Sequence, residues 1–472
     1  MLEPTIGIEI HAHLKSKTKA FSSSVNNFDS LPNENISLID LAYPGALPRL
    51  NKEVIEMALK AALALNCSIN KEMHFDRKNY FYPDLPKGYQ ITQNRTPIGY
   101  DGYLMIDVDG KQKRIAIERI HIEEDTAKSI HGQAGTILDF NRSGVPLIEI
   151  VTKPVITSEK EAVAYLEGIR EILLYLGISD VKIEEGSMRC DANISLSERG
   201  SKKLGTKTEV KNIGSISNVG TSILYEINRQ KKLIESGNKV INETRRFDDK
   251  TNSTITMRVK ETASDYRYFP EPNIPPLELS EEYILEVKNS LPVLPNVLRN
   301  KYNKLAINQN NVKTIIGNYQ LCQFFETVID DINPIIAANV LTGEVLNYLN
   351  KNKLEMKDIK LTEHNFKELI DAYEKGTISS KHIKDIIPIL LDKGGAVKDI
   401  INELGIQQIN DDKLILEVIN KVIKNNSESV TDYKNGQDRA LKFLMGQVMK
   451  ETRGQVNPAK ASSLLTEELA KL

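Results

Sequence analysis

Acidic and histidine side chains occupy alternate positions in the segment TIGIEIHAHL, residues 5–14. Successive side chains of a strand point to opposite faces, so a strand here would carry Glu9, His11 and His13 on one face. The other face would carry three apolar residues, Ile6, Ile8 and Ile10. That face suits a buried core. A carboxylate beside an imidazole suits a metal ion, but a single histidine is as typical of a structural role, so other strands must decide.

Further segments of the first half of the chain carry carboxylates with the same alternation. In SMRCDANISL (187–196), one face would hold Arg189, Asp191, Asn193 and Ser195. In TKTEVKNI (206–213), one face would hold Lys207, Glu209 and Lys211. In IERIHIEED (117–125), one face would hold Arg119, His121, Glu123 and Asp125, and the opposite face Glu124. In PLIEIV (146–151), Glu149 interrupts an apolar run, and a buried carboxylate there needs a partner.

Carboxylates that share a sheet face repel one another, so a cluster of them requires positive charge nearby. Divalent cations are the usual solution, and oxygen ligands with one imidazole suit magnesium or manganese. Such sites commonly serve the phosphates of a nucleotide, and Lys207, Lys211 and Arg189 are suited to bind those phosphates directly. An isolated acidic residue on a strand is typically only solvated. The metal hypothesis therefore depends on these faces converging.

Other familiar catalytic motifs are absent from the sequence. It contains no GxxxxGK[ST] phosphate loop, no GxGxxG after a strand and no GxSxG nucleophile motif. Two polar loops are candidates for binding groups, DRKNYFYPDLPKGYQITQ (76–93) and DFNRSGVPLIEI (139–150). The second places Asn141, Arg142 and Ser143 immediately before the strand that carries Glu149.

The composition is that of a globular protein without a strong charge bias. The 472 residues carry a formal net charge of -2, which argues against binding nucleic acid through bulk charge alone. Three widely spaced cysteines disfavour a disulfide framework and fit a reducing compartment. No apolar run is long enough to span a membrane, and no secretory signal is visible.

The elements that must position these residues change character along the chain. Up to about residue 275, short alternating segments are mixed with two helical patterns at 51–66 and 158–178. The proline-rich YFPEPNIPPLEL (268–279) interrupts regular structure, and almost everything after it has helical spacing. We expect an α+β fold with three domains, a mixed or antiparallel sheet domain (1–280), a helical domain (281–400) and a small helical tail (401–472).

Seven ordered motifs resemble the GatB family, the B subunits of aspartyl/glutamyl-tRNA amidotransferases. They are IGIEIHAHL, KNYFYPDLPKGYQITQ, RIHIEEDTAK, DFNRSGVPLIEIV, MRCDANIS, KTEVKNI and ASDYRYFPEPNIPPLEL. The tail segment GQVMKETRGQVNPAKASSLL resembles the end of that family's YqeY-like domain. The resemblance covers essentially the whole chain. It implies a cradle-like catalytic domain, an all-α domain and a YqeY-like helical tail.

The resemblance also implies a reaction. ATP phosphorylates the side-chain carboxylate of misacylated Glu-tRNA(Gln) or Asp-tRNA(Asn), and ammonia then displaces the phosphate to give Gln-tRNA(Gln) or Asn-tRNA(Asn). The implied partners are an amidase-like A subunit that releases ammonia from glutamine, and a small C subunit, in a heterotrimer. The implied cofactors are ATP as substrate and Mg²⁺. The resemblance fits a bacterial-type cytoplasmic protein and leaves an organellar location open.

Carried over residue by residue, the resemblance implies the following site. The metal-binding set is Glu9, His11, Glu123, Glu124, Glu149, Asp191 and Glu209, and alternation leaves open which of Glu123 and Glu124 binds. The residues expected to act in catalysis are Glu9, His11, Glu149 and Lys211. Nucleotide or aminoacyl contacts are expected from Arg189, Asn193, Lys207 and Arg142. In the tail, tRNA contacts are expected from Lys442, Lys450, Arg453 and Lys460.

The sequence departs from one pattern of the family. Many members carry a CxC and CxxC zinc set after the first strand, and here the matching positions are Ser22, Ser24, Ser37 and Asp40. Serine lacks the thiolate that zinc prefers, so we expect no structural zinc.

Two other functions remain as alternatives. The chain could be a non-catalytic scaffold that only binds tRNA, but a scaffold has no need for carboxylate-rich strands. It could also be a stand-alone phosphotransferase for a small molecule, which would work without tRNA or partner subunits. The tail and the ordered motifs favour the amidotransferase function over both.

Overall fold

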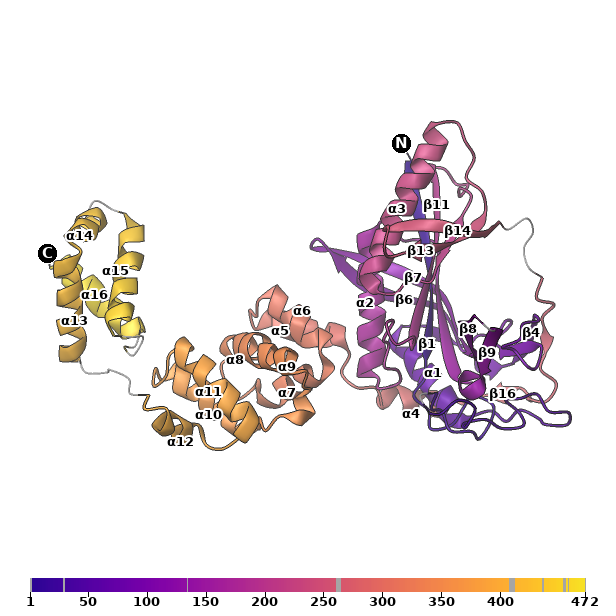
Figure 1. The fold of residues 1–472 in the computed structure, drawn as a ribbon, viewed down its shortest axis with the longest axis horizontal. Coiled ribbons are helices and arrows are strands. Elements are labelled where there is room, and N and C mark those ends of the chain that lie inside the picture. Colours follow the sequence, from indigo (N-terminus) through magenta and orange to yellow (C-terminus); the bar gives the residue numbers. More distant parts are fainter. Residues whose placement is uncertain are drawn as a thin grey trace. The chain divides into compact units, whose positions relative to one another are not determined.

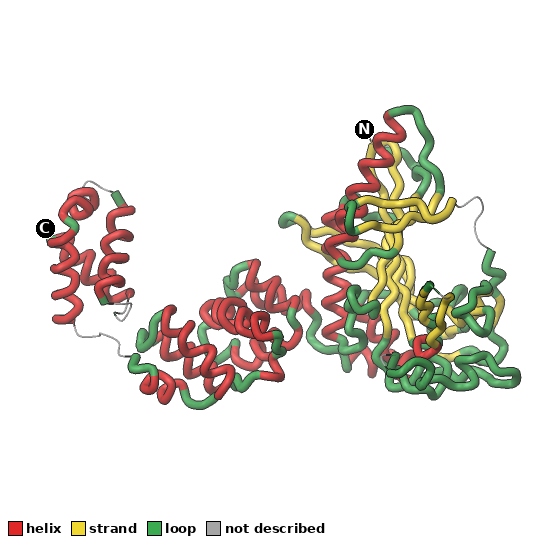
Figure 2. Tube along the Cα trace, in the orientation of Figure 1, coloured by secondary structure: helices red, strands yellow, loops and turns green. Residues whose placement is uncertain are grey.

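The computed structural model describes residues 2–471 except 29, 134, 260–264, 407–411, 435–436, 453–455 and 457. Two compact units follow one another along the chain, Met1–Pro295 and Asn296–Leu472. The first unit contains the sheets and the second is helical, so the α+β prediction is confirmed (Figures 1 and 2). An additional boundary near residue 400 stays a prediction.

A large mixed sheet forms the centre of the first unit. Among the described residues it has nine strands in the order β14-β13-β12-β11-β1-β10-β7-β6-β2. The central strands are β11 (Met188–Glu198), β1 (Leu2–His13), β10 (Pro146–Thr152) and β7 (Lys111–Glu124). The outer strands are β12 (Thr208–Lys211), β13 (Glu243–Asp248), β14 (Ser253–Val259), β6 (Gly99–Val108) and β2 (Ser68–Ile69). Neighbours are antiparallel except β12 and β13, which are parallel.

Three helices pack on the sheet and bury its apolar face. They are α1 (Lys52–Ala64), α2 (Glu159–Tyr175) and α3 (Ile216–Glu235). Ile6, Ile8 and Ile10 are fully buried in this core, as the alternation in β1 predicts. The helices expected at 51–66 and 158–178 are present, and the Ser158 side chain caps α2 by accepting a hydrogen bond from the Glu161 amide. The opposite face of β1 is left for polar side chains.

Smaller sheets complete the first unit. A three-stranded sheet combines β15 (Phe269–Pro270), β4 (Asp76–Asn79) and β5 (Tyr89–Thr92). Two pairs are formed by β16 (Leu277–Glu278) with β3 (Glu72–Met73), and by β8 (Lys128–Gly132) with β9 (Gly135–Asp139). The short 3₁₀ helix η1 (Phe140–Arg142) follows β9 and leads into β10. The last helix of this unit is α4 (Glu281–Asn289).

The second unit is built from helices. Its first part contains α5 (Pro295–Lys304), α6 (Gln309–Gly317), α7 (Tyr319–Val328), α8 (Pro334–Val340), the π-helical η2 (Leu341–Val345), α9 (Leu346–Asn352), the 3₁₀ helix η3 (Met356–Asp358), α10 (Glu363–Glu374), α11 (Ser380–Lys393) and α12 (Val397–Glu403). Its last part contains α13 (Asp412–Asn425), α14 (Ser427–Lys434), α15 (Asp438–Glu451) and α16 (Pro458–Ala470), which share a small apolar core. Among the described residues, no helix is both long and apolar enough to cross a membrane.

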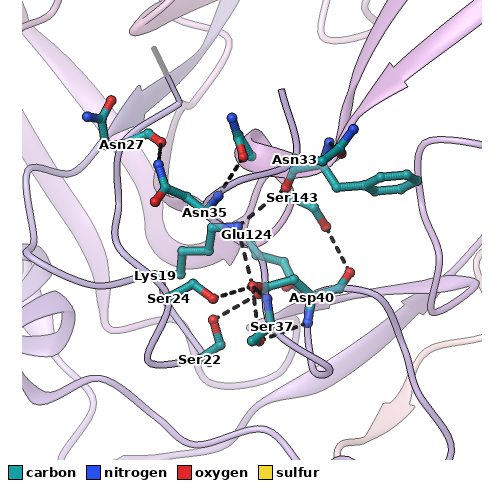
Figure 3. Close-up of polar contacts among 12 residues, drawn as sticks. Lys19, Ser22, Ser24, Asn27, Asn33, Asn35, Ser37, Asp40, Glu124 and Ser143 are labelled. Carbon is teal, nitrogen blue, oxygen red and sulfur yellow. Dashed lines mark hydrogen bonds and ion pairs between the residues drawn. The ribbon is translucent and has the colours of Figure 1, made fainter. Parts of the chain in front are cut away.

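A buried polar cluster, here called the Asp40 cluster, organises the long loop after β1 (Figure 3). Asp40 accepts hydrogen bonds from the hydroxyls of Ser22 at 2.8 Å, Ser24 at 2.7 Å and Ser37 at 3.0 Å. The fully buried Lys19 lies with its Nζ 3.4 Å from Asp40 Oδ2. Hydrogen bonds therefore join Asp40 to Ser22, Ser24 and Ser37, the four positions that match the zinc set.

The Asp40 cluster also ties this loop to the segment that precedes β10. Lys19 Nζ donates to the Phe140 carbonyl at 3.4 Å, and the Ser143 hydroxyl donates to the Asp40 carbonyl at 3.3 Å. Farther along the loop, the backbone N–H of Asn35 donates to the side-chain Oδ1 of Asn141 at 2.8 Å. These bonds fix η1 and so the start of the strand that carries Glu149.

Removing the charge of Asp40 should destabilise the first unit more than removing that of Lys19. The variant D40N leaves a buried ammonium without its carboxylate, and we expect a loss of about 3–5 kcal/mol. The variant K19M leaves a carboxylate that still accepts hydrogen bonds from three serines, so its loss should be smaller. The measurement is urea denaturation followed through the transition of the first unit.

The exposed pair Lys15 and Asp180, 2.7 Å apart, supplies the control. Because surface ion pairs are worth less than about 1 kcal/mol, D180N should change stability little. Equal effects of D40N and D180N would contradict the role given to the Asp40 cluster.

Candidate metal and nucleotide site

The pairing of the central strands places the sequence-predicted residues in adjacent rows. His11 in β1 lies opposite Glu149 in β10 on one side and Arg189 in β11 on the other. Glu149 in turn lies opposite His121 in β7. Two residues before His11 in β1, Glu9 lies opposite Asp191. The polar faces that the sequence predicts therefore converge on one face of the sheet.

The first group of potential ligands consists of His11, Glu123 and Glu149. One ligand atom from each of these residues lies within 4.8 Å of the others. His11 Nε2 is 3.3 Å from Glu123 Oε1 and 3.7 Å from Glu149 Oε2. His121 completes the surroundings, with its Nε2 2.9 Å from Glu149 Oε2.

Electrostatic coupling within the first group stabilises the charged forms. Burial lowers the pKa of His11, but the hydrogen bond with Glu123 and the charge of Glu149 outweigh burial and raise it to about 9. Burial raises the pKa of Glu149, but the charge and hydrogen bond of His121 outweigh burial and hold it well below its usual range. Burial also raises the pKa of Glu123, but the hydrogen bond with His11 and the charge of His11 outweigh burial and lower it. Both carboxylates are therefore ionised and available as ligands.

The second group consists of Glu9, Asp191 and Glu209, again with one ligand atom from each within 4.8 Å of the others. Lys211 Nζ lies 2.5 Å from Asp191 Oδ2 and 3.3 Å from Glu209 Oε1. Burial lowers the pKa of Lys211, but the charges of Asp191 and Glu209 outweigh burial and raise it. Burial, with the charges of Glu149 and Asp191, raises the pKa of Glu9. Glu9 and His11 lie two residues apart on the same face of β1, so the two groups are neighbours.

Each carboxylate of the second group has its own polar partner. The Asn193 amide donates to Glu9 Oε1 at 2.9 Å, and the Thr244 hydroxyl donates to Glu209 Oε2 at 2.8 Å. Asp191 is held by Lys211, as described above. Such partners orient a carboxylate before a cation binds.

The residues present fit a divalent cation. In the first group, Glu123 Oε2 is buried and accepts no hydrogen bond from the described residues. In the second group, three carboxylates converge around a single lysine, and burial together with the charges of Glu149 and Asp191 raises the pKa of Glu9. Oxygen ligands with one imidazole match the preference of Mg²⁺ or Mn²⁺.

Glu124 points away from both groups. Its carboxylate pairs with Lys87 and accepts a hydrogen bond from the Ile91 amide at 2.9 Å. Glu123 and Glu124 are adjacent in β7 and lie on opposite faces, so of these two residues the structure brings only Glu123 into a ligand group. That Glu123 and not Glu124 would bind a cation stays a prediction, and this position favours it.

The expected phosphate-binding residues lie in different surroundings. Arg189 Nη2 is 2.9 Å from the buried Asp125, which also contacts His13 Nε2 at 2.9 Å. Arg142 donates to the carbonyls of Thr126 and Ala127, at 2.9 and 2.8 Å, and so supports a loop. Lys207 is exposed, just before β12 begins. Asn193 contacts Glu9. Among the basic residues expected to bind phosphate, Lys211 and Arg189 lie nearest to the two ligand groups.

Sequence reasoning missed three residues of the site. His121 was visible on the predicted polar face of β7, but its contact with Glu149 depends on strand pairing. Thr244 belongs to a short strand that carries no recognisable motif. Lys78 in β4 comes from a different sheet, and its pKa is raised, although burial lowers it, mainly by the charge of Glu123.

The expected tRNA contacts lie in the last helices. Lys442 and Lys450 belong to α15. Lys460 in α16 forms an ion pair with Asp412. Arg453 lies outside the described residues.

Comparisons with known proteins show the family to which the chain is similar. Residues 4–285 match the family model described as GatB/GatE catalytic domain, and residues 323–469 match the one described as GatB domain. A protein of Enterococcus faecalis is 48% identical over 472 residues, covering 99% of each chain, and is named as the B subunit of an aspartyl/glutamyl-tRNA(Asn/Gln) amidotransferase. Proteins of Bacillus mycoides and Bacillus cereus with the same name are 47% identical over 100% of this chain and 99% of their own length.

Cation binding to the first group should depend on pH because of His11. Its imidazole must lose a proton to become a ligand, and its pKa is raised to about 9. The affinity for Mn²⁺ should therefore rise about tenfold per pH unit as the pH approaches that value. Calorimetric titration at several pH values measures this slope.

The variant H11N provides the comparison, because its amide does not titrate in this range. It should bind Mn²⁺ with little pH dependence. A wild-type slope identical to that of H11N would show that His11 is not a ligand.

Proposed function

The chain belongs to the GatB family of tRNA-dependent amidotransferase subunits, and from this we propose its reaction. It phosphorylates the side-chain carboxylate of Glu-tRNA(Gln), Asp-tRNA(Asn) or both with ATP. It then transfers ammonia to the activated carboxylate, and phosphate leaves. The products are Gln-tRNA(Gln) and Asn-tRNA(Asn).

The observation that carries this proposal is the pair of neighbouring carboxylate groups on one sheet face. A carboxylate is a poor electrophile for ammonia, and phosphorylation supplies the leaving group that it lacks. Phosphoryl transfer needs mainly positioning and neutralised charge. We propose that His11, Glu123 and Glu149 hold one Mg²⁺ and that Glu9, Asp191 and Glu209 hold another. Bound there, Mg²⁺ would neutralise charge on the phosphates of ATP.

Two basic side chains of the chain itself are placed to bind phosphate oxygens. The side chain of Lys211 is 33% exposed while it contacts the second group. The side chain of Arg189 is 44% exposed, and Asp125 holds its guanidinium. Both are therefore accessible to a ligand and held by a carboxylate. We propose that Lys211 and Arg189 bind phosphate oxygens of ATP or of the acyl phosphate.

The partners follow from the same family. The relatives are named as B subunits, so we propose that the chain works in a heterotrimer with an amidase-like A subunit, which releases ammonia from glutamine, and a small C subunit. We place it in the cytoplasm, since its cysteines Cys67, Cys190 and Cys322 are free, as expected in a reducing compartment. A purely structural scaffold would not require the two carboxylate groups.

The variants E149A and E123A test the proposal in the assembled heterotrimer. Supplied with glutamine, ATP, Mg²⁺ and misacylated tRNA, both should lose roughly 10²–10³-fold in amidated tRNA, because the charge neutralisation removed is worth several kcal/mol. The readouts are amidated tRNA and tRNA-dependent ATP cleavage. The glutaminase activity of the A subunit is scored separately and reports on assembly.

The variant E118A, at an exposed position of the same strand β7, serves as the matched control and should retain activity. Normal activity of E149A and E123A would favour the scaffold function instead.

The tail should bind tRNA through backbone phosphates. The double variant K442E/K450E should weaken tRNA binding and reduce its dependence on salt, since each phosphate contact contributes roughly one unit to the salt slope. Filter binding at several salt concentrations measures both quantities. K351E, a charge reversal at the end of α9, is the comparison, and an equal loss in both variants would contradict a specific role of α15.

A further inference from the structure

We propose that Thr244 is a positioning residue, which fixes the carboxylate of Glu209 for cation binding in the second group. The inference rests on the proposed function, because it concerns the cation that this group would hold. It adds a residue that no sequence motif indicates, on a strand at the edge of the site.

The contact is direct and buried. The Thr244 hydroxyl donates to Glu209 Oε2 at 2.8 Å, and the two residues lie opposite each other in the parallel pairing of β13 with β12. Thr244 is 3% exposed and Glu209 is 8% exposed. A hydrogen bond to one carboxylate oxygen fixes the plane of the carboxylate, and so the direction in which its other oxygen points.

Lys211 lies closer to Asp191 than to Glu209. Asp191 is held by Lys211 at 2.5 Å, whereas the same Nζ is 3.3 Å from Glu209 Oε1. Glu209 also belongs to the short strand β12, which has only four residues. The hydroxyl of Thr244 therefore supplies the shorter of these two polar contacts to Glu209.

A charged network beside Thr244 in β13 holds this residue in place. Arg245 Nη1 contacts Glu243 Oε1 at 2.8 Å. Arg229 of α3 lies 3.2 Å from Glu243, and it pairs with the fully buried Glu226 at 2.6 Å. The pairing of β13 with β14 shifts between Thr244 and Arg245, next to this network. The network joins β13 to α3, so the position of the Thr244 backbone is strongly determined.

The chain offers a matched control on the neighbouring strand. The Thr256 hydroxyl in β14 donates to Glu243 Oε2, also at 2.8 Å. Thr256 and Thr244 thus make the same type of bond to a glutamate, and of these two residues Thr244 is the one that contacts a ligand group. Replacing each by valine removes one hydroxyl with the same change of shape. Thr256 differs in being exposed and in accepting a second hydrogen bond, from Arg245 at 2.7 Å.

The test compares T244V, T244S and T256V in the assembled heterotrimer. Mn²⁺ binding is measured by electron paramagnetic resonance, and the Mg²⁺ requirement of tRNA-dependent ATP cleavage is measured in parallel. T244V should weaken one class of Mn²⁺ site about 10- to 100-fold and raise the Mg²⁺ requirement by a similar factor, as loss of a ligand's partner usually does. T244S, which keeps the hydroxyl, should restore both values. In T256V, Glu243 keeps its contacts with Arg245 and Arg229, so this variant should bind Mn²⁺ as the wild type does.

Three outcomes are distinguishable. Wild-type Mn²⁺ binding in T244V, or an equal loss in T256V, would overturn the inference, because the bond would then be dispensable or merely structural. If T244V fails to fold, T244A replaces it, and rescue by T244S is judged against that variant. If the wild-type complex itself neither binds Mn²⁺ nor cleaves ATP in the presence of tRNA, the proposed function fails, and the inference with it.

Discussion

Repulsion among carboxylates on one face of a sheet is the constraint on which the structure of this site depends. The glutamates and aspartate of the two ligand groups come from five strands, β1, β7, β10, β11 and β12. Like charges in a buried setting cost free energy unless positive charge or hydrogen bonds compensate them. The sheet supplies such compensation from within, by histidines in one group and by a lysine in the other. A protein without a use for these carboxylates would gain by replacing them.

The rest of the first unit holds the strands in the positions that this compensation requires. The apolar face of the sheet is covered by α1, α2 and α3, so each central strand is fixed from behind. A slip of one residue in β1 would bury Glu9 and His11 in that core and expose its isoleucines. The start of β10 is fixed by the Asp40 cluster and the far edge by the network around Glu226. Polar interactions thus fix the start of β10 and the far edge of the sheet, while apolar packing fixes the central strands from behind.

Much of this arrangement could be predicted from the sequence, because alternation in a strand is a local property. The polar and apolar faces of β1, the α+β class and the change to helices after the proline-rich segment all follow from patterns within a few residues. Strand pairing is not local. It brings His121 to Glu149 and Thr244 to Glu209 across different strands, and no spacing in the sequence encodes these contacts. The contact of Glu124 with Lys87 likewise joins residues that are distant in sequence.

The two ligand groups differ in how they are neutralised, and this difference has a chemical consequence. Histidine can give up its proton when a cation binds, so the first group would lose one positive charge and gain two. The pKa of Lys211 is raised by the charges around it, although burial lowers it, so this lysine stays protonated and keeps its charge. A cation in the second group would therefore compete with Lys211 for Asp191 and Glu209, and would weaken the hold of these carboxylates on its ammonium. An ammonium released in this way would need a new anionic partner, and a phosphate group of the substrate would be suited to that role.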